Sequence, residues 1–269
     1  MLRQRDYGPV RYFALARSIA GRALLTSGIY FVDNLLIDTG PSNARSEFDK
    51  ILENLTVEQI VLTHHHEDHT GNAAGAAQRL GVTPLAYASG LPLLRRPPTL
   101  PPYRLLVWGK PAPCEAAALT AEIHTRNYCF EVLHTPGHAP DHVVLYEPDQ
   151  RWLFTGDLYL ADRLKVLRSD EEIGGIISSL RQMLRVPDCQ LFCQHSGGHR
   201  SHQQRLAAKL DFLLGLQEKI VVQHEEGRTM AEITRALKLQ KPFWRMISRG
   251  EFSGVNLVAA LLQNAGIDV

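Results

Sequence analysis

The sequence predicts an α/β fold with a helical C-terminal extension, and three observations support this prediction. Segments with a strand pattern open the chain, strand and helix patterns then alternate, and after about residue 200 only helical patterns remain. The length of 269 residues is compatible with one large domain or with one domain plus an appendage. We therefore expect one domain over residues 1–199 and a helical extension over residues 200–269.

The opening segments predict an antiparallel sheet, because the turn pair Asp33-Asn34 separates two short β-rich runs. A helix ending near Gly81 consists of small residues and follows a short buried strand. The expected elements of this part are, in order, strands 10–16, 28–32 and 35–38, a helix over about 44–55, a strand ending at residue 62, the helix ending near residue 81 and a strand over 84–88.

Seven prolines between residues 90 and 113 are expected to interrupt any regular element there. A long ordered loop of this kind often lines or covers a site, and a rigid surface connection is the alternative. Strand patterns resume at residues 122–124, 130–134, 142–146 and 152–154.

The C-terminal extension is expected to contain helices over residues 201–217 and 255–262, with a short helix capped by Thr229 between them. Between residues 200 and 251 there are ten Lys and Arg against six Asp and Glu, which suits an anionic ligand or a solvated face. Three roles stay open for this extension: packing on the main domain, walling a substrate cleft, or forming a homodimer through Phe243, Trp244 and Phe252.

Composition and charge narrow the classes of partner. The net charge of +1 gives no general attraction to polyanions, so a nucleic acid is a less favoured partner than a small molecule.

The four cysteines contain no C-x-x-C pair and are too sparse for a disulfide framework, which favours a reducing compartment. The N-terminus lacks the apolar core of a signal peptide, and no apolar run approaches a membrane span. We expect a cytoplasmic protein without a membrane partner.

The segment from Thr63 to His69 concentrates potential metal ligands directly after a buried strand. In an extended segment residues i and i+2 point the same way, so His64 and His66 can reach one ion while His65 and Glu67 turn away. Asp68 and His69, beyond the corner between strand and helix, are free to face a second ion.

Further candidate ligands follow three later strands, where a scaffold can present rigid side chains to one point. His138 ends the run His-Thr-Pro-Gly-His, Asp157 ends Phe-Thr-Gly-Asp, and His195 ends Leu-Phe-Cys-Gln-His. His199 and His202 compete with His195 for the last of these roles.

These motifs resemble those of the metallo-β-lactamase superfamily. The H-x-H-x-D-H signature stands as His64, His66, Asp68 and His69, and the T-P-G-H, G-D and final His motifs follow in the expected order. The run Leu36–Gly40 is similar to the Asp-Thr-Gly turn of the group. The resemblance covers about residues 10 to 200 and implies a four-layer αββα sandwich, with the helical extension after it.

The resemblance also implies a binuclear metal site. One ion would be held by His64, His66 and His138 and the other by Asp68, His69 and His195, with Asp157 bridging both. Asp38 would either support the ligand loop or serve only to form its turn. All these donors are nitrogen or oxygen, which permits two divalent ions, with zinc expected first and iron or manganese as alternatives.

Two such ions, about 3.5 to 4 Å apart, can hold a hydroxide that is a nucleophile at neutral pH, and Asp68 would orient it or move its proton. We therefore expect a hydrolase of a small ester, thioester or lactone. Asp157 argues against true β-lactamases, which generally lack this carboxylate, and is shared with glyoxalase II enzymes, whose basic glutathione-binding pattern is not identifiable here. The alternatives are a metal-dependent endoribonuclease, which residues 134–142 and 227–233 resemble, and a metal-binding sensor with little turnover.

Overall fold

The structure is a computed structural model that describes residues 2–19, 22–23, 25–239 and 242–268. The chain divides into two compact units. The first unit consists of Met1–Thr135, Pro140–Leu160 and Cys189–Arg200, and the second of Pro136–Ala139, Ala161–Asp188 and Ser201–Val269. The domain division expected at residue 199 stays a prediction, and each unit is described by itself.

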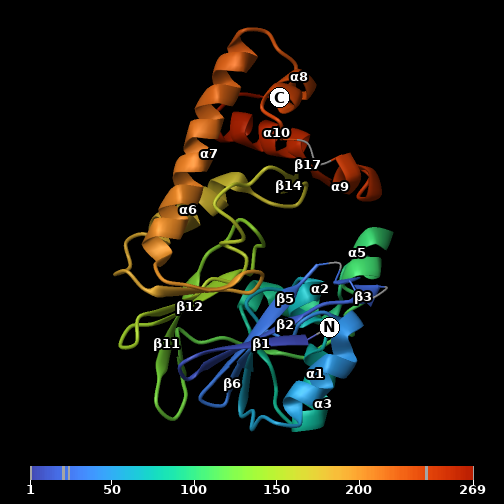
Figure 1. Ribbon diagram of the computed structural model, residues 1–269, viewed down its shortest axis with the longest axis vertical. Helices are drawn as coiled ribbons and strands as arrows, with labels where there is room; N and C mark the ends of the chain where they lie inside the picture. Colours follow the sequence, from blue (N-terminus) through green and yellow to red (C-terminus); the bar gives the residue numbers. More distant parts are fainter. Residues whose placement is uncertain (1, 20–21, 24, 240–241, 269) are drawn as a thin grey trace. The chain divides into compact units, whose positions relative to one another are not determined.

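One mixed sheet of the first unit begins with the antiparallel strands expected from the sequence (Figure 1). Asp33 and Asn34 both have positive φ, as a tight hairpin turn between two twisted strands requires. The pairing then becomes parallel, because β6 (Leu35–Ile37) pairs with β7 (Gln59–Val61) and β7 pairs with β8 (Leu85–Ala86). The strand order is β1 (Leu2–Tyr7), β2 (Val10–Leu15), β5 (Ser27–Val32), β6 (Leu35–Ile37), β7 (Gln59–Val61), β8 (Leu85–Ala86) and β9 (Ala117–Ala118).

A second mixed sheet in the same unit carries the strands that precede the later candidate ligands. Its order is β10 (Glu122–His124), β11 (Cys129–His134), β12 (Val143–Glu147), β13 (Trp152–Phe154), β15 (Gln190–Cys193) and β16 (Gly197–His199). A small hairpin of β3 (Ser18–Ile19) and β4 (Arg22–Ala23) lies outside both sheets.

The core of the first unit is divided into two apolar layers by the first sheet. Leu36 and Ile60 point to one face and pack with Phe48 of helix α1 (Arg45–Leu52) and Ala76 of helix α3 (Ala73–Leu80). Residues of the opposite face, such as Tyr30, pack with the second sheet. The α/β prediction is confirmed, and this unit by itself contains a helix layer followed by two sheet layers.

The segment between residues 90 and 113 differs from expectation, because it contains two short helices. These are α4 (Leu91–Arg95), after the short 3-10 turn η2 (Ala88–Gly90), and α5 (Pro102–Val107). Each has a proline in its first two positions, where the missing N–H is not needed for a helical hydrogen bond. The prolines therefore begin these helices rather than prevent them.

The second unit is mainly helical, and helix α10 packs against α6, α7 and α8 (Figure 1). Thr229 caps α8 in a reciprocal capping box with Glu232, as its position predicts. Helix α6 was not anticipated, and α7 continues beyond the expected end. The helices are α6 (Ile173–Met183), α7 (His202–Glu225), α8 (Met230–Ala236), α9 (Pro242–Ile247) and α10 (Gly254–Asn264), and β14 (Leu167–Arg168) pairs with β17 (Phe252–Ser253).

The structure bears on the expectations about a membrane and about a homodimer. Within the described part of the chain, no helix combines the length and apolarity needed to cross a membrane. Of the side chains expected at a homodimer contact, Phe243 is exposed and Phe252 is half-buried, while the Trp244 side chain lies outside the described residues. The homodimer stays a prediction.

Candidate metal centre

The loop that carries the first candidate ligands leaves β7 at the edge where the parallel strands end. The short helix α2 (Glu67–Thr70) follows in this loop. The carbonyl of His69 accepts hydrogen bonds from both the backbone N–H and the hydroxyl of Thr39, at 2.7 and 2.9 Å. Because Thr39 belongs to the turn after β6, the loop is held by the neighbouring strand of the sheet.

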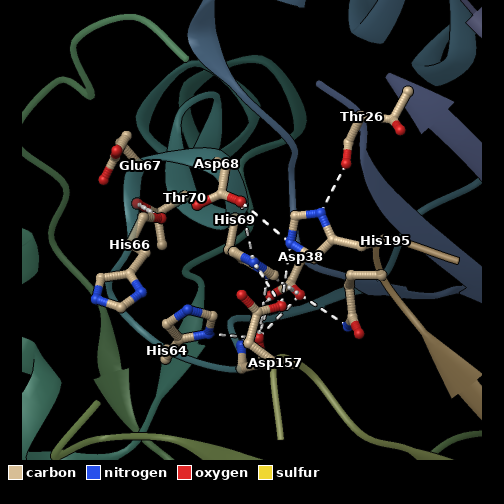
Figure 2. Close-up of polar contacts among 12 residues, drawn as sticks. Thr26, Asp38, His64, His66, Glu67, Asp68, His69, Thr70, Asp157 and His195 are labelled. Carbon is tan, nitrogen blue, oxygen red and sulfur yellow. Dashed lines mark hydrogen bonds and ion pairs between the residues drawn. The ribbon is translucent and has the colours of Figure 1, made fainter. Parts of the chain in front are cut away.

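Four candidate ligands of the first unit converge on one point (Figure 2). One nitrogen or oxygen atom from each of Asp68, His69, Asp157 and His195 lies within 4.8 Å of the others. Nε2 of His69 is 3.4 Å from Oδ2 of Asp68 and 3.3 Å from Oδ1 of Asp157. Nε2 of His195 is 3.4 Å and 3.2 Å from the same two atoms.

The other nitrogen of each imidazole shows which tautomer is present. Nδ1 of His69 lies 2.9 Å from a carboxylate oxygen of Asp38, and Nδ1 of His195 lies 2.7 Å from the carbonyl oxygen of Thr26. Both partners can only accept, so both Nδ1 atoms donate and both Nε2 atoms present a lone pair in the neutral ring. Nε2 of His69 has no hydrogen-bond partner among the described residues. Lone pairs and carboxylates that converge in this way fit a divalent cation.

Electrostatics support the same conclusion. Burial would lower the pKa of His69 and of His195, but the surrounding carboxylates outweigh burial and hold both pKa values well above their usual range. Burial would raise the pKa of Asp68 and of Asp157, but the two imidazoles hold both pKa values well below theirs. The four side chains therefore favour a positive charge next to the two carboxylates. This charge is carried either by protonated imidazoles or by a metal ion.

Asp38 is the residue that fixes this half of the site. Its Oδ1 accepts the backbone N–H of Thr63 at 2.8 Å, and its Oδ2 accepts from the Thr63 hydroxyl, from His69 and from Nε2 of Gln194, each at 2.9 Å. Asp38 also has a positive φ of 63°, which turns the chain. Both roles that the sequence left open for Asp38 are present.

His64 and His66 lie side by side, with their ring centroids 4.4 Å apart. Because the Thr63 hydroxyl donates to Asp38, its oxygen can accept from Nδ1 of His64 at 3.1 Å, which leaves Nε2 of that ring as the lone-pair side. His138 belongs to the second unit, and its grouping with His64 and His66 stays a prediction.

Within the second unit, Nδ1 of His138 lies 2.6 Å from a carboxylate oxygen of Glu171. Burial would raise the pKa of Glu171, but the hydrogen bond with His138 and its charge outweigh burial and lower that pKa. A carboxylate behind an imidazole is the usual partner of a metal-binding histidine. Glu171 was not predicted, because it lies 33 positions from His138 in a segment with no motif.

Asp157 is placed by a turn that only glycine accommodates. Gly156 has φ +49°, and a Cβ there would lie 2.4 Å from Nε2 of His142. That nitrogen accepts the backbone N–H of Asp157 at 2.9 Å, while Nδ1 of His142 is 2.8 Å from the Thr135 hydroxyl. His142 therefore positions the Asp157 backbone.

His195 follows a strand end that two buried tyrosines hold. The hydroxyl of Tyr30 donates to the carbonyl of Cys193 at 2.7 Å, and that of Tyr12 donates to the carbonyl of Gln194 at 3.0 Å. Neither competitor of His195 joins the four converging ligands. His199 contacts Ser196 in the first unit, and His202 contacts the carbonyl of Met183 in the second.

The two loop residues expected to turn away from the ions do so, and each has a partner that the sequence did not reveal. Nδ1 of His65 lies 2.7 Å from Oδ1 of the buried Asp141. The carboxylate of Glu67 accepts two hydrogen bonds from the guanidinium of Arg104 on α5, at 2.6 and 2.5 Å, and both residues are buried. The segment over residues 90–113 is thereby connected to the loop over residues 64–69.

Comparison with known proteins agrees with these observations. The sequence pattern described as the metallo-beta-lactamase superfamily matches residues 27–224. The hydroxyacylglutathione hydrolase of Idiomarina loihiensis is 26% identical over 221 residues, which cover 80% of this chain and 78% of that protein. The hydroxyacylglutathione hydrolase of Hydrogenovibrio crunogenus is 28% identical over 143 residues, 52% of this chain, and the chain spans only 46% of that relative's length.

Solved structures show the same fold. A metallo-beta-lactamase family protein from Thermus thermophilus is similar with a TM-score of 0.70 at 20% identity, over 95% of this chain and 94% of that one. TTHA1623, solved in a di-iron-bound form, is similar with a TM-score of 0.56 at 27% identity, over 70% of this chain and 94% of that one.

Proposed function

Because the chain belongs to the metallo-β-lactamase superfamily, we propose that it is a metal-dependent hydrolase of ester, thioester or lactone bonds. The observation that carries this proposal is the convergence of Asp68, His69, Asp157 and His195, with Oδ1 of Asp157 beside both imidazoles. We would test a thioester first among these three substrates, because two bacterial relatives are named hydroxyacylglutathione hydrolases.

The residues of the site have separable tasks. Two divalent ions, when bound at a site of this kind, lower the pKa of water to about 7 and polarise the substrate carbonyl. Asp38 and the Thr26 carbonyl accept from Nδ1 of His69 and His195, so the Nε2 lone pairs of both rings would be available to hold an ion. Asp157 would contact both ions, and its backbone is fixed by the hydrogen bond from its N–H to His142.

Asp68 is the residue we assign to proton transfer. Its side chain is 10% exposed, more than that of Asp157 at 6%, and its Oδ2 lies beside both imidazoles. A carboxylate in this position can hold the proton of the attacking water and pass it to the leaving group. An Asp68→Asn variant that keeps full metal content and full activity would contradict this assignment.

The function is tested on protein loaded separately with zinc, iron and manganese. Metal content is measured first, and hydrolysis is then measured for a hydroxyacylglutathione thioester, alkyl esters, lactones and single-stranded RNA. We expect two ions per chain and hydrolysis of at least one carbonyl substrate that is lost in Asp157→Ala. Metal-dependent cleavage of RNA alone would replace the proposal by an endoribonuclease, and two bound ions without any turnover would support a sensor.

A further inference from the structure

Among the candidate ligands of the first unit, His195 is the most exposed. Its side chain is 21% exposed, compared with 6% for Asp157 and 0% for His69. His195 is therefore the candidate ligand of the first unit that solvent, and hence a substrate, reaches most easily.

Besides the imidazole of His69, the indole of Trp108, directly after α5, lies next to His195. The two ring centroids are 6.2 Å apart, with an angle of 59° between the ring planes. The backbone carbonyl of Trp108 accepts hydrogen bonds from the backbone N–H of Asn43 at 3.0 Å and from the Ser42 hydroxyl at 3.4 Å. The backbone N–H of Trp108 donates to the Arg104 carbonyl at 2.8 Å. The backbone that presents this indole is therefore fixed.

Further apolar side chains lie on the segments that meet at His195. Leu105 and Leu106 of α5 are 37% and 51% exposed. The guanidinium of Arg17 donates to the Leu106 carbonyl at 2.6 Å and joins α5 to the end of the β2–β5 pair. Leu25, which is 39% exposed, precedes Thr26, whose carbonyl accepts from His195. We name Leu25, Leu105, Leu106 and Trp108 the apolar rim.

We propose that the apolar rim binds an apolar substituent of the substrate, so that the substrates are esters or thioesters with an alkyl or aryl group next to the reacting carbonyl. The inference rests on the proposed function and deepens it. Single exposed apolar side chains are common on protein surfaces, but these four lie on segments that meet at the most exposed candidate ligand of the first unit, which favours a binding surface.

The test measures binding rather than turnover. Straight-chain carboxylates of two to ten carbons are titrated by calorimetry into the metal-loaded full chain, since every member offers the same carboxylate to the ions. Affinity is expected to rise by about fourfold for each added methylene that the rim buries. Trp108→Ala is expected to remove most of this rise while leaving acetate binding unchanged, and Trp108→Phe is expected to keep it.

Leu106→Asp is a second variant, chosen because its half-exposed side chain can change without disturbing the fold. It should weaken octanoate binding and leave acetate binding unchanged. Val222→Ala, at an exposed apolar position of α7 in the second unit, is the matched control and should change neither. Metal content is measured in every variant, and if Trp108→Ala loses metal, the result for Leu106→Asp decides.

The outcomes separate this inference from the proposed function. Equal dependence on chain length in wild type, Leu106→Asp and metal-loaded Trp108→Ala would overturn the apolar rim, and so would no dependence in the wild type, even if esters are hydrolysed. A rise in affinity that these two variants abolish would support the rim, even if no ester, thioester or lactone were hydrolysed and the proposed function failed.

Discussion

The two sides of the loop formed by residues 64–69 differ in where their side chains are directed. On its ligand side, His69 is supported by the buried carboxylate of Asp38, in an arrangement that leaves a lone pair for a metal. On its anchor side, His65 and Glu67 are paired with Asp141 and Arg104, which have no place among the four converging ligands. The difference indicates that metal affinity and the stability of the fold can be changed separately in one short loop.

The largest effect on the ligand side is expected from Asp38. Asp38→Ala removes the acceptor of hydrogen bonds from Thr63, His69 and Gln194, all of which are buried or partly buried. Loss of a carboxylate behind a ligand histidine lowers metal affinity by about 10- to 100-fold. Competition with a chelator measures this loss, and thermal unfolding of the metal-free protein measures the accompanying loss of stability.

Asp38→Asn distinguishes support of the fold from control of the tautomer. The amide oxygen can still accept from Thr63, but the amide NH₂ then faces Nδ1 of His69 and Nε2 of Gln194. Nδ1 would have to accept, which places the proton on Nε2, where the metal binds. We expect Asp38→Asn to lose metal affinity nearly as far as Asp38→Ala but less stability. Wild-type affinity in this variant would show that Asp38 does not set the tautomer.

The anchor side should show the opposite pattern in the variants Glu67→Gln and Arg104→Leu. Removing one partner of a buried ion pair leaves an uncompensated charge and costs about 3–5 kcal/mol in the free energy of unfolding. The double variant Glu67→Leu with Arg104→Leu should recover much of that loss, because an apolar pair does not leave a buried charge. Denaturant unfolding of the metal-free protein measures all three.

The chain contains a matched control for this pair. Arg95 and Glu115 form the same two-point contact, with nitrogen–oxygen distances of 3.0 and 2.8 Å, but their side chains are 58% and 73% exposed. Arg95→Leu should leave the unfolding midpoint nearly unchanged, since exposed pairs are screened by water and salt. A loss in Arg95→Leu equal to that in Arg104→Leu would show that burial does not explain the strength of the anchor.

The sequence predicted the ligand side of the loop far better than its anchor side. The i, i+2 spacing of His64 and His66 and the strand before them are local features, so periodicity alone places these side chains on one side. The partners of the anchor side are distant, since Arg104 lies 37 positions after Glu67 in a segment whose prolines hid a helix. The Thr26 carbonyl that orients His195 has no sequence signal at all, because every residue carries a backbone carbonyl.

Apart from the control variant Arg95→Leu, the smallest of these effects is expected for His65→Ala, on the anchor side. Asp141 is 1% exposed, and its Oδ2 has no hydrogen-bond partner among the described residues, so His65 holds its other oxygen. Removing the imidazole leaves a buried carboxylate with fewer donors, which costs about 1–3 kcal/mol. Denaturant unfolding measures the cost, and chelator competition should show metal affinity within about twofold of wild type.

Pairing this change with Asp141→Ala separates the anchor from the metal site. If the interaction between His65 and Asp141 is the whole effect, the double variant should be no less stable than His65→Ala, because the buried carboxylate that lost its donor is also gone. Loss of metal in His65→Ala would contradict the separation of the two sides. It would mean that the position of His64 and His66 depends on the ring between them, and that the loop acts as one unit.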